Sequence, residues 1–163
     1  MKAHTLDAEM WLPLAIDKVF AFFSDAHNLE QLTPSYVHFE VLTPRPIEMR
    51  AGVRLDYRLR IRGVPIRWGS EITIWEPPHL FVDEQRRGPY RFWVHRHEFA
   101  DKDGGTLVRD HVDYMPRGWL CAPLINRLVV APDLKAIFDY RHKKIRELLA
   151  PASLGASDKI EMS

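Results

Sequence analysis

The stretch PDLKAIFDYRHKKIRELL, residues 132–149, is the longest helical pattern in the chain and decides which fold the other residues can build. At about 100° per residue, its apolar side chains fall within about 60° of one line along the helix. They are Leu134, Ile137, Phe138, Ile145, Leu148 and Leu149. This spacing predicts a surface helix with one buried stripe, which requires an apolar partner of similar length.

Arg141 interrupts this stripe, because it projects between Phe138 and Ile145. Its guanidinium either reaches water over its neighbours or faces a lined cavity that holds an acidic or hydrogen-bonding partner. An unpaired charge in a low-dielectric interior costs several kcal/mol. The remaining sequence has to supply the partner if the second arrangement holds.

The composition is that of an ordinary globular domain. The chain has 163 residues, of which 46% are hydrophobic, and a formal net charge of +1, so we expect no nucleic-acid partner. The only cysteine, Cys121, excludes an intrachain disulfide and favours a reducing compartment. There is neither a signal-peptide pattern nor a run of 18 apolar residues, so we expect a cytoplasmic protein without a membrane span. Whether it is a monomer or a dimer stays open.

Alternating apolar and polar residues predict seven strands. They cover residues 4–12, 37–41, 53–62, 68–74, 79–87, 90–99 and 106–115. A helical pattern over residues 16–31 predicts two short helices after the first strand. The clearest strand is 53–62, whose odd-numbered residues are apolar and whose even-numbered residues are charged. In the strand that follows, we expect Trp68, Ser70, Ile72 and Ile74 on the inner face.

The connections between the later strands are short, so the sheet should be antiparallel and follow chain order. We therefore predict an α+β fold, in which a curved seven-stranded antiparallel sheet wraps around the long C-terminal helix. We expect a single domain over residues 1–150. Residues 151–163 are small and polar, and we expect them to form a disordered tail.

The register of the last hairpin follows from its charges. If paired residue numbers sum to 207, Glu98 lies opposite Arg109, which is a favourable cross-strand pair. His97 then lies opposite Asp110, and a shift by one residue would mix the polar and apolar faces.

In this register, the apolar face of the hairpin also carries several polar groups. They come from Trp93, His95, His97, Asp110 and Tyr114. Buried polar groups need partners, so these residues form a structural network, or the wall of a ligand pocket, or both. We predict that Arg141 contacts Asp110, directly or through one water.

Four segments resemble one known superfamily. They are SDAHNLEQLTP (24–34), WEPPHLFVDEQRRGPYRFWVHRHEF (75–99), GTLVRDHVDYMPRG (105–118) and IFDYRHKKI (137–145). Over residues 3–149 the chain resembles the START-like, SRPBCC superfamily, and within it the bacterial polyketide cyclase/dehydrase and coenzyme Q-binding-like branch. The resemblance implies the helix-grip fold and a deep hydrophobic cavity between the sheet and the C-terminal helix. Fold alone does not decide activity.

We therefore expect a noncatalytic carrier or sensor that binds a small hydrophobic or aromatic molecule, such as a lipid, quinone or polyketide-like compound. The expected cavity residues are Tyr57, Trp68, Ser70, Trp93, His95, His97, Phe99, Asp110, Val112, Tyr114, Phe138 and Arg141.

Two alternatives involve catalytic or metal chemistry. The first is a polyketide-type cyclase, aromatase or hydratase that uses His97, Asp110, Tyr114 and Arg141 as acid–base and oxyanion groups. The second is a metal centre, because the histidines of the sequence His-Arg-His at 95–97 share one face. A metal needs further ligands, and only Asp110 is expected nearby, so we expect no metal and no cofactor.

Overall fold

The computed structural model describes residues 3–117, 126–150 and 158–163. Its strands form one sheet in the order β2-β3-β4-β5-β6-β7-β1-β8, and every neighbouring pair is antiparallel. The strands are β1 (His4–Leu12), β2 (Glu40–Val41), β3 (Arg54–Ile61), β4 (Val64–Glu76), β5 (Leu80–Arg87), β6 (Tyr90–Lys102), β7 (Gly105–Pro116) and β8 (Lys159–Met162).

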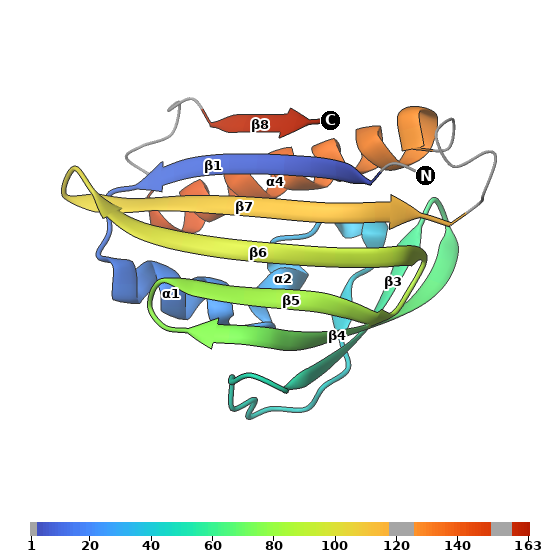
Figure 1. Cartoon of the computed structure of the whole chain (residues 1–163), viewed down its shortest axis with the longest axis horizontal. Coiled ribbons are helices and arrows are strands. Elements are labelled where there is room, and N and C mark those ends of the chain that lie inside the picture. Colours follow the sequence, from blue (N-terminus) through green and yellow to red (C-terminus); the bar gives the residue numbers. More distant parts are fainter. Residues whose placement is uncertain (1–2, 118–125, 151–157) are drawn as a thin grey trace.

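The α-helices of the described residues lie on one face of this sheet, behind it in the view of Figure 1. They are α1 (Ile16–Ser24), α2 (Asn28–Gln31) and the long α4 (Ala131–Leu149). A short 3-10 turn, η1 (Ser35–Val37), follows α2, and a π-helical turn, η3 (Asn126–Val130), leads into α4. Pro132 fits the first turn of α4 because that position needs no backbone N–H donor. This is the predicted helix-grip arrangement, with a long C-terminal helix against a curved antiparallel sheet.

The predicted register and strand faces are confirmed. In the β6–β7 hairpin, His97 pairs with Asp110 and Glu98 pairs with Arg109. In β3, the side chains of Leu55, Tyr57 and Leu59 are buried and the arginines between them are exposed. The inner face of β3 therefore points toward the helices.

The number of strands and the expected tail are corrected by the structure. The sheet has eight strands, because β8 pairs with β1 and places Ile160 opposite Ala8 and Met162 opposite Leu6. The side chains of Ile160 and Met162 pack on the apolar cluster beneath β1. This burial holds β8 in place, although the strand is too short for its sequence to show a clear alternation of apolar and polar residues. Residues 151–157 of the expected tail lie outside the described residues, as does Cys121.

Two expected strand features are also wrong. Val37 belongs to η1, because His38 takes a left-handed backbone conformation (φ 47°), and strand β2 is confined to Glu40–Val41. Ile74 is 36% exposed, because the β4–β5 register shifts between Ile72 and Ile74. This bulge turns Trp75 toward the core, where its ring lies 5.2 Å from that of Phe20.

The buried side of α4 is more polar than predicted. Leu148 is 42% exposed, whereas His142 and Arg146 are buried together with Leu134, Phe138 and Ile145. Arg146 binds the Asp158 carboxylate through two nitrogens, and its Nη1 also donates to the carbonyl oxygen of Trp11. His142 Nδ1 lies 3.5 Å from the same carboxylate. Asp158, which directly precedes β8, is therefore the ion-pair partner that allows the charged side chain of Arg146 to be buried on α4.

In the part of the chain that the structure describes, no helix is long and apolar enough to cross a membrane.

Candidate functional site

A cavity of about 160 Å³ lies between the sheet and α4. Most of its wall is aromatic or aliphatic, with contributions from α1, α2, the strands β3 to β6 and α4. Of the expected cavity residues, those that line it are Tyr57, Trp68, Ser70, Trp93, His95, His97, Phe138 and Arg141. Wall residues that sequence reasoning did not single out include Phe23, Leu29, Phe39, Met49, Asp83 and Ile137.

Four expected cavity residues do not border it. Phe99 is covered by α1, with its ring 5.3 Å from Phe20 and 5.4 Å from Phe23. Val112 and Tyr114 are fully buried in the packed cluster beneath α4. Asp110 lies on β7, and His95 and His97 stand between its carboxylate and Asp83 on the cavity wall. The pattern placed these residues on the correct face of the sheet, but neighbouring side chains cover them.

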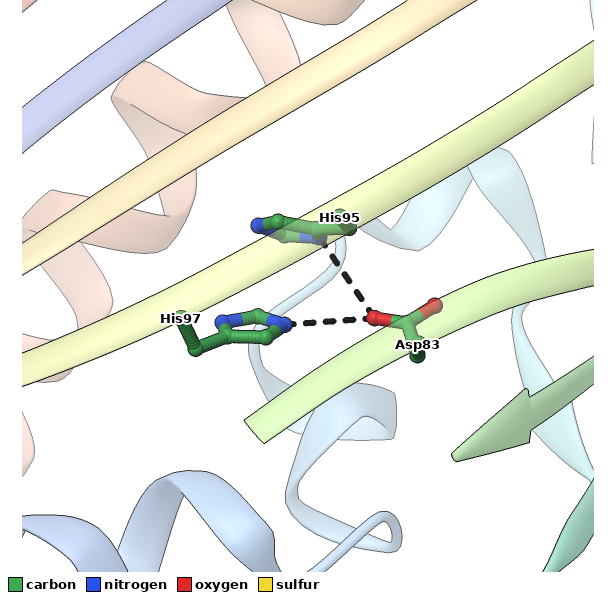
Figure 2. A group of neighbouring side chains, drawn as sticks. All are labelled: Asp83, His95 and His97. Atoms are coloured by element: carbon green, nitrogen blue, oxygen red, sulfur yellow. Dashed lines mark hydrogen bonds and ion pairs between the residues drawn. The ribbon is translucent and has the colours of Figure 1, made fainter. Parts of the chain in front are cut away.

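The two histidines of β6 line the cavity together with Asp83, and Figure 2 shows how these three side chains lie. His95 and His97 alternate along the strand, so they share a face, and their ring centroids are 3.7 Å apart. Asp83 pairs with His95 across the β5–β6 ladder. Its Oδ2 lies 3.2 Å from His97 Nε2 and 3.8 Å from His95 Nδ1.

Asp110 contacts the opposite nitrogens of the same two rings. Its Oδ1 is 3.0 Å from His95 Nε2, with hydrogen-bond geometry. His97 Nδ1 lies 2.7 Å from the same oxygen, at an angle unsuited to a hydrogen bond. The two neighbouring imidazoles thus lie between the buried carboxylate of Asp110 and the half-buried carboxylate of Asp83. We call these four residues the inner cluster: Asp83, His95, His97 and Asp110.

A short hydrogen-bond chain fixes the carboxylate of Asp83. The indole N–H of Trp68 donates to Ser70 Oγ over 3.0 Å, and this hydroxyl donates to Asp83 Oδ1 over 3.3 Å. Ser70 is buried, so its hydroxyl has to be satisfied within the protein. The orientation of Asp83 is therefore set from the β4 side, and its Oδ2 faces the histidines.

Burial and mutual contacts set the protonation of the inner cluster. Burial alone would raise the pKa of Asp110, but His95 and His97 hold it well below its usual range. Burial and the charge of His97 lower the pKa of His95. Burial also disfavours the charged form of His97, but Asp110 and Asp83 outweigh it and raise the pKa of His97. The surroundings therefore favour the charged form of His97 and the neutral form of His95.

Arg141 reaches the cavity, but it does not form the predicted direct pair with Asp110. Among the described residues no carboxylate lies within ion-pair distance of Arg141, and its buried Nε has no hydrogen-bond partner. Its guanidinium carbon is 5.0 Å from the ring centroid of Phe138. Burial lowers the pKa of Arg141, while Asp110 and Asp83 act in the opposite direction. The direct pair is absent because the histidines already engage Asp110; contact through one water stays a prediction.

Comparison with known proteins supports the fold and gives the family. No curated protein matches the chain. Over residues 12–135 it matches the family described as polyketide cyclase / dehydrase and lipid transport.

Solved structures with a similar architecture come from organisms that are only distantly related to one another. A Thermus thermophilus protein is 20% identical with a TM-score of 0.69, and the match covers 91% of this chain and 99% of the other. A START superfamily protein from Mycobacterium smegmatis is 10% identical, with a TM-score of 0.68 and coverages of 92% and 99%. Major latex-like protein 151 of Panax ginseng is 13% identical, with a TM-score of 0.67 and coverages of 91% and 99%.

At these identities the structural likeness establishes the fold, and the family match extends over more than half of the chain. The protein therefore belongs to the polyketide cyclase / dehydrase and lipid transport family, and it has the START-like helix-grip fold.

Proposed function

We propose that this protein binds one small apolar or aromatic molecule between the sheet and α4, as a noncatalytic carrier or sensor. The observation that carries this proposal is the cavity itself, which has an apolar, aromatic wall and a few buried polar groups at one end. Small-molecule sites commonly have this composition, because the apolar wall supplies affinity and the polar groups fix orientation.

The size of the cavity limits the ligand. An apolar cavity of about 150 Å³ is large enough to hold benzene, and this one measures about 160 Å³. A compound with one aromatic ring and a short substituent fits without movement of the wall. A lipid chain, a quinone tail or a polyketide would have to displace wall side chains, so we propose the single-ring class as the ligand of this conformation.

Arg141 gives the ligand a direction. Its buried Nε is a donor without a partner among the described residues, and leaving such a donor unsatisfied costs about 1–3 kcal/mol or more. A hydrogen-bond acceptor on the ligand would remove that cost. The expected ligand therefore carries a carbonyl or similar acceptor at the end that approaches α4.

The acid–base alternative has less support. Of its four groups, Tyr114 and Asp110 do not border the cavity, whereas His97 and Arg141 do. A catalytic role would have to be carried by the two remaining groups and Asp83.

Calorimetric titration with ethylbenzene tests the proposal. We expect saturable binding of one molecule per chain. Ile137→Trp, which places a large side chain in the cavity wall, should weaken binding by about tenfold or more. Leu148→Trp is the matched control, because Leu148 lies on the exposed side of the same helix. Absence of saturable binding, or equal loss in both variants, would refute the proposal. Mass spectrometry of extracted protein would identify the natural compound.

A further inference from the structure

We propose that Asp83, His95 and His97 form a binding site for a divalent transition-metal ion of the zinc class, with an open coordination position toward the ligand cavity. This inference goes beyond ligand binding, and it reverses the expectation of no metal. The sequence supplied two histidines on one face and no third ligand except Asp110. The structure adds Asp83 from the neighbouring strand.

The first support is the separation of the ligand atoms. Asp83 Oδ2, His95 Nδ1 and His97 Nε2 all lie within 4.8 Å of one another. Bonds of about 2.0–2.2 Å at tetrahedral angles place ligand atoms about 3.3 Å apart. The two nitrogen–oxygen distances are 3.2 and 3.8 Å, so a small rotation of side chains would seat an ion between the three groups. In Figure 2 both rings direct a nitrogen toward the same carboxylate oxygen.

The second support is the contacts behind the ligands. Asp110 lies against the opposite nitrogen of each ring, His95 Nε2 and His97 Nδ1. A carboxylate on the far nitrogen orients a metal-binding imidazole and makes it a better ligand. Ser70 holds the other oxygen of Asp83. Asp110 thus supports both histidines from behind, and Ser70 supports Asp83.

The third support is charge. Metal binding displaces any proton from the ligand nitrogens, and with both imidazoles neutral the carboxylates of Asp83 and Asp110 carry two negative charges in a largely buried region. One divalent ion neutralises both, and imidazole nitrogen with one carboxylate oxygen is a ligand set that suits zinc and its neighbours in the first transition series. All three ligands belong to the cavity wall, so a fourth position would be open to water or to an acceptor on a bound molecule.

Metal titration of the full chain, stripped with a chelator, tests this inference. We expect one Zn²⁺ per chain by calorimetry, and a visible ligand-field absorption band when Co²⁺ is used instead. Asp83→Asn and His95→Gln should abolish uptake of the ion. Asp110→Asn should keep the stoichiometry and weaken affinity by about 10–100-fold, because it removes only the supporting contact.

The matched control is His111→Gln. His111 also lies between two carboxylates, with Nδ1 2.6 Å from Asp7 and Nε2 3.2 Å from Asp113, but on the exposed face of the sheet. This variant should take up the ion like the unmodified chain. Circular dichroism checks that each variant is folded, and the unmodified chain provides a second readout, since a bound ion should raise its unfolding temperature.

Failure of the stripped, folded, unmodified chain to bind either ion would overturn the inference. So would uptake that is lost in His111→Gln but retained in Asp83→Asn, since the ion would then occupy the outer face. Neither result depends on whether ethylbenzene binds in the cavity.

Discussion

The two faces of the sheet carry similar groups of histidine and aspartate in opposite surroundings. On the inner face, the inner cluster lies between β5, β6 and β7, with His95, His97 and Asp110 buried and Asp83 half-buried. On the outer face, His111 lies between Asp7 and Asp113, and we call these three residues the outer cluster. The side chain of His111 is 41% exposed. His111 follows Asp110 directly along β7, so the two clusters belong to consecutive residues of one strand.

This difference shows how strongly exposure to solvent changes the contribution of the same contact to stability. Exposed ion pairs contribute about 0–1 kcal/mol, because water and salt screen them. Removing one partner of a buried pair costs about 3–5 kcal/mol, because the other charge stays buried. Consecutive residues of β7 should therefore differ several-fold in their effect on stability.

The largest effect is expected for Asp110→Ala. The replacement leaves His95 and His97 without the contacts that hold their orientation, and should lower the free energy of unfolding by about 3–5 kcal/mol in metal-free protein. Urea denaturation at neutral pH measures this loss. Asp113→Ala, on the outer face of the same strand, should cost about 1 kcal/mol or less. Equal losses in the two variants would contradict the comparison.

An intermediate effect is expected for Arg141→Met. This replacement should change the affinity for a ligand more than the stability of the fold. Met keeps most of the apolar volume, and the side chain that it replaces is half-buried and has no ion-pair partner among the described residues, so the free energy of unfolding should change by about 1 kcal/mol or less. Binding of acetophenone should weaken by about tenfold, or about 1.4 kcal/mol, because its carbonyl loses a donor. Ethylbenzene, which has no acceptor, is the control and should bind unchanged. Equal weakening of acetophenone and ethylbenzene binding would show that Arg141 only shapes the cavity wall.

The smallest effect is expected for the outer cluster. The hydrogen bond with Asp7 raises the pKa of His111 above its usual value. A raised pKa in the folded state means that the stabilisation is fully present below the unfolded pKa of about 6.5 and is lost as the pH rises through the folded value. Because His111 is partly exposed, we expect a loss well under 1 kcal/mol.

Proton NMR titration of the His111 ring checks this sign. Asp7→Asn should lower the pKa of His111 and leave only the smaller contribution of Asp113, and high salt should reduce the shift in the unmodified chain. A pKa of His111 below 6.5 in the unmodified chain would rule out stabilisation by Asp7.

The sequence was sufficient to predict the fold class and the register of the hairpin that carries the histidines. The charges of Glu98 and Arg109 determine the β6–β7 register, and this register places His97 opposite Asp110. The helical pattern of residues 132–149 differs from α4 by one residue at its start. These features depend on local alternation and on neighbouring strands joined by short turns, which a single sequence displays.

Asp83 was missed because the register of the preceding hairpin is irregular. Residues 88 and 89 form the turn, and a regular hairpin would pair Asp83 with Val94, which faces away from the histidines. The observed pairing is with His95, because the strands shift by one residue near the turn. The direct Arg141–Asp110 contact is absent for a related reason, because two imidazole rings from the neighbouring strand lie against Asp110.

Strand β8 has a consequence for how copies of this protein behave toward one another. Without β8, one side of β1 would present the unpaired N–H and C=O groups of a nine-residue strand, which is a template for a strand from another molecule. The strand that covers it has only four residues, and its exposed side chains, Lys159 and Glu161, are charged. At the opposite border, β2 has only two residues. Both borders of the sheet are therefore poor surfaces for joining sheets into aggregates.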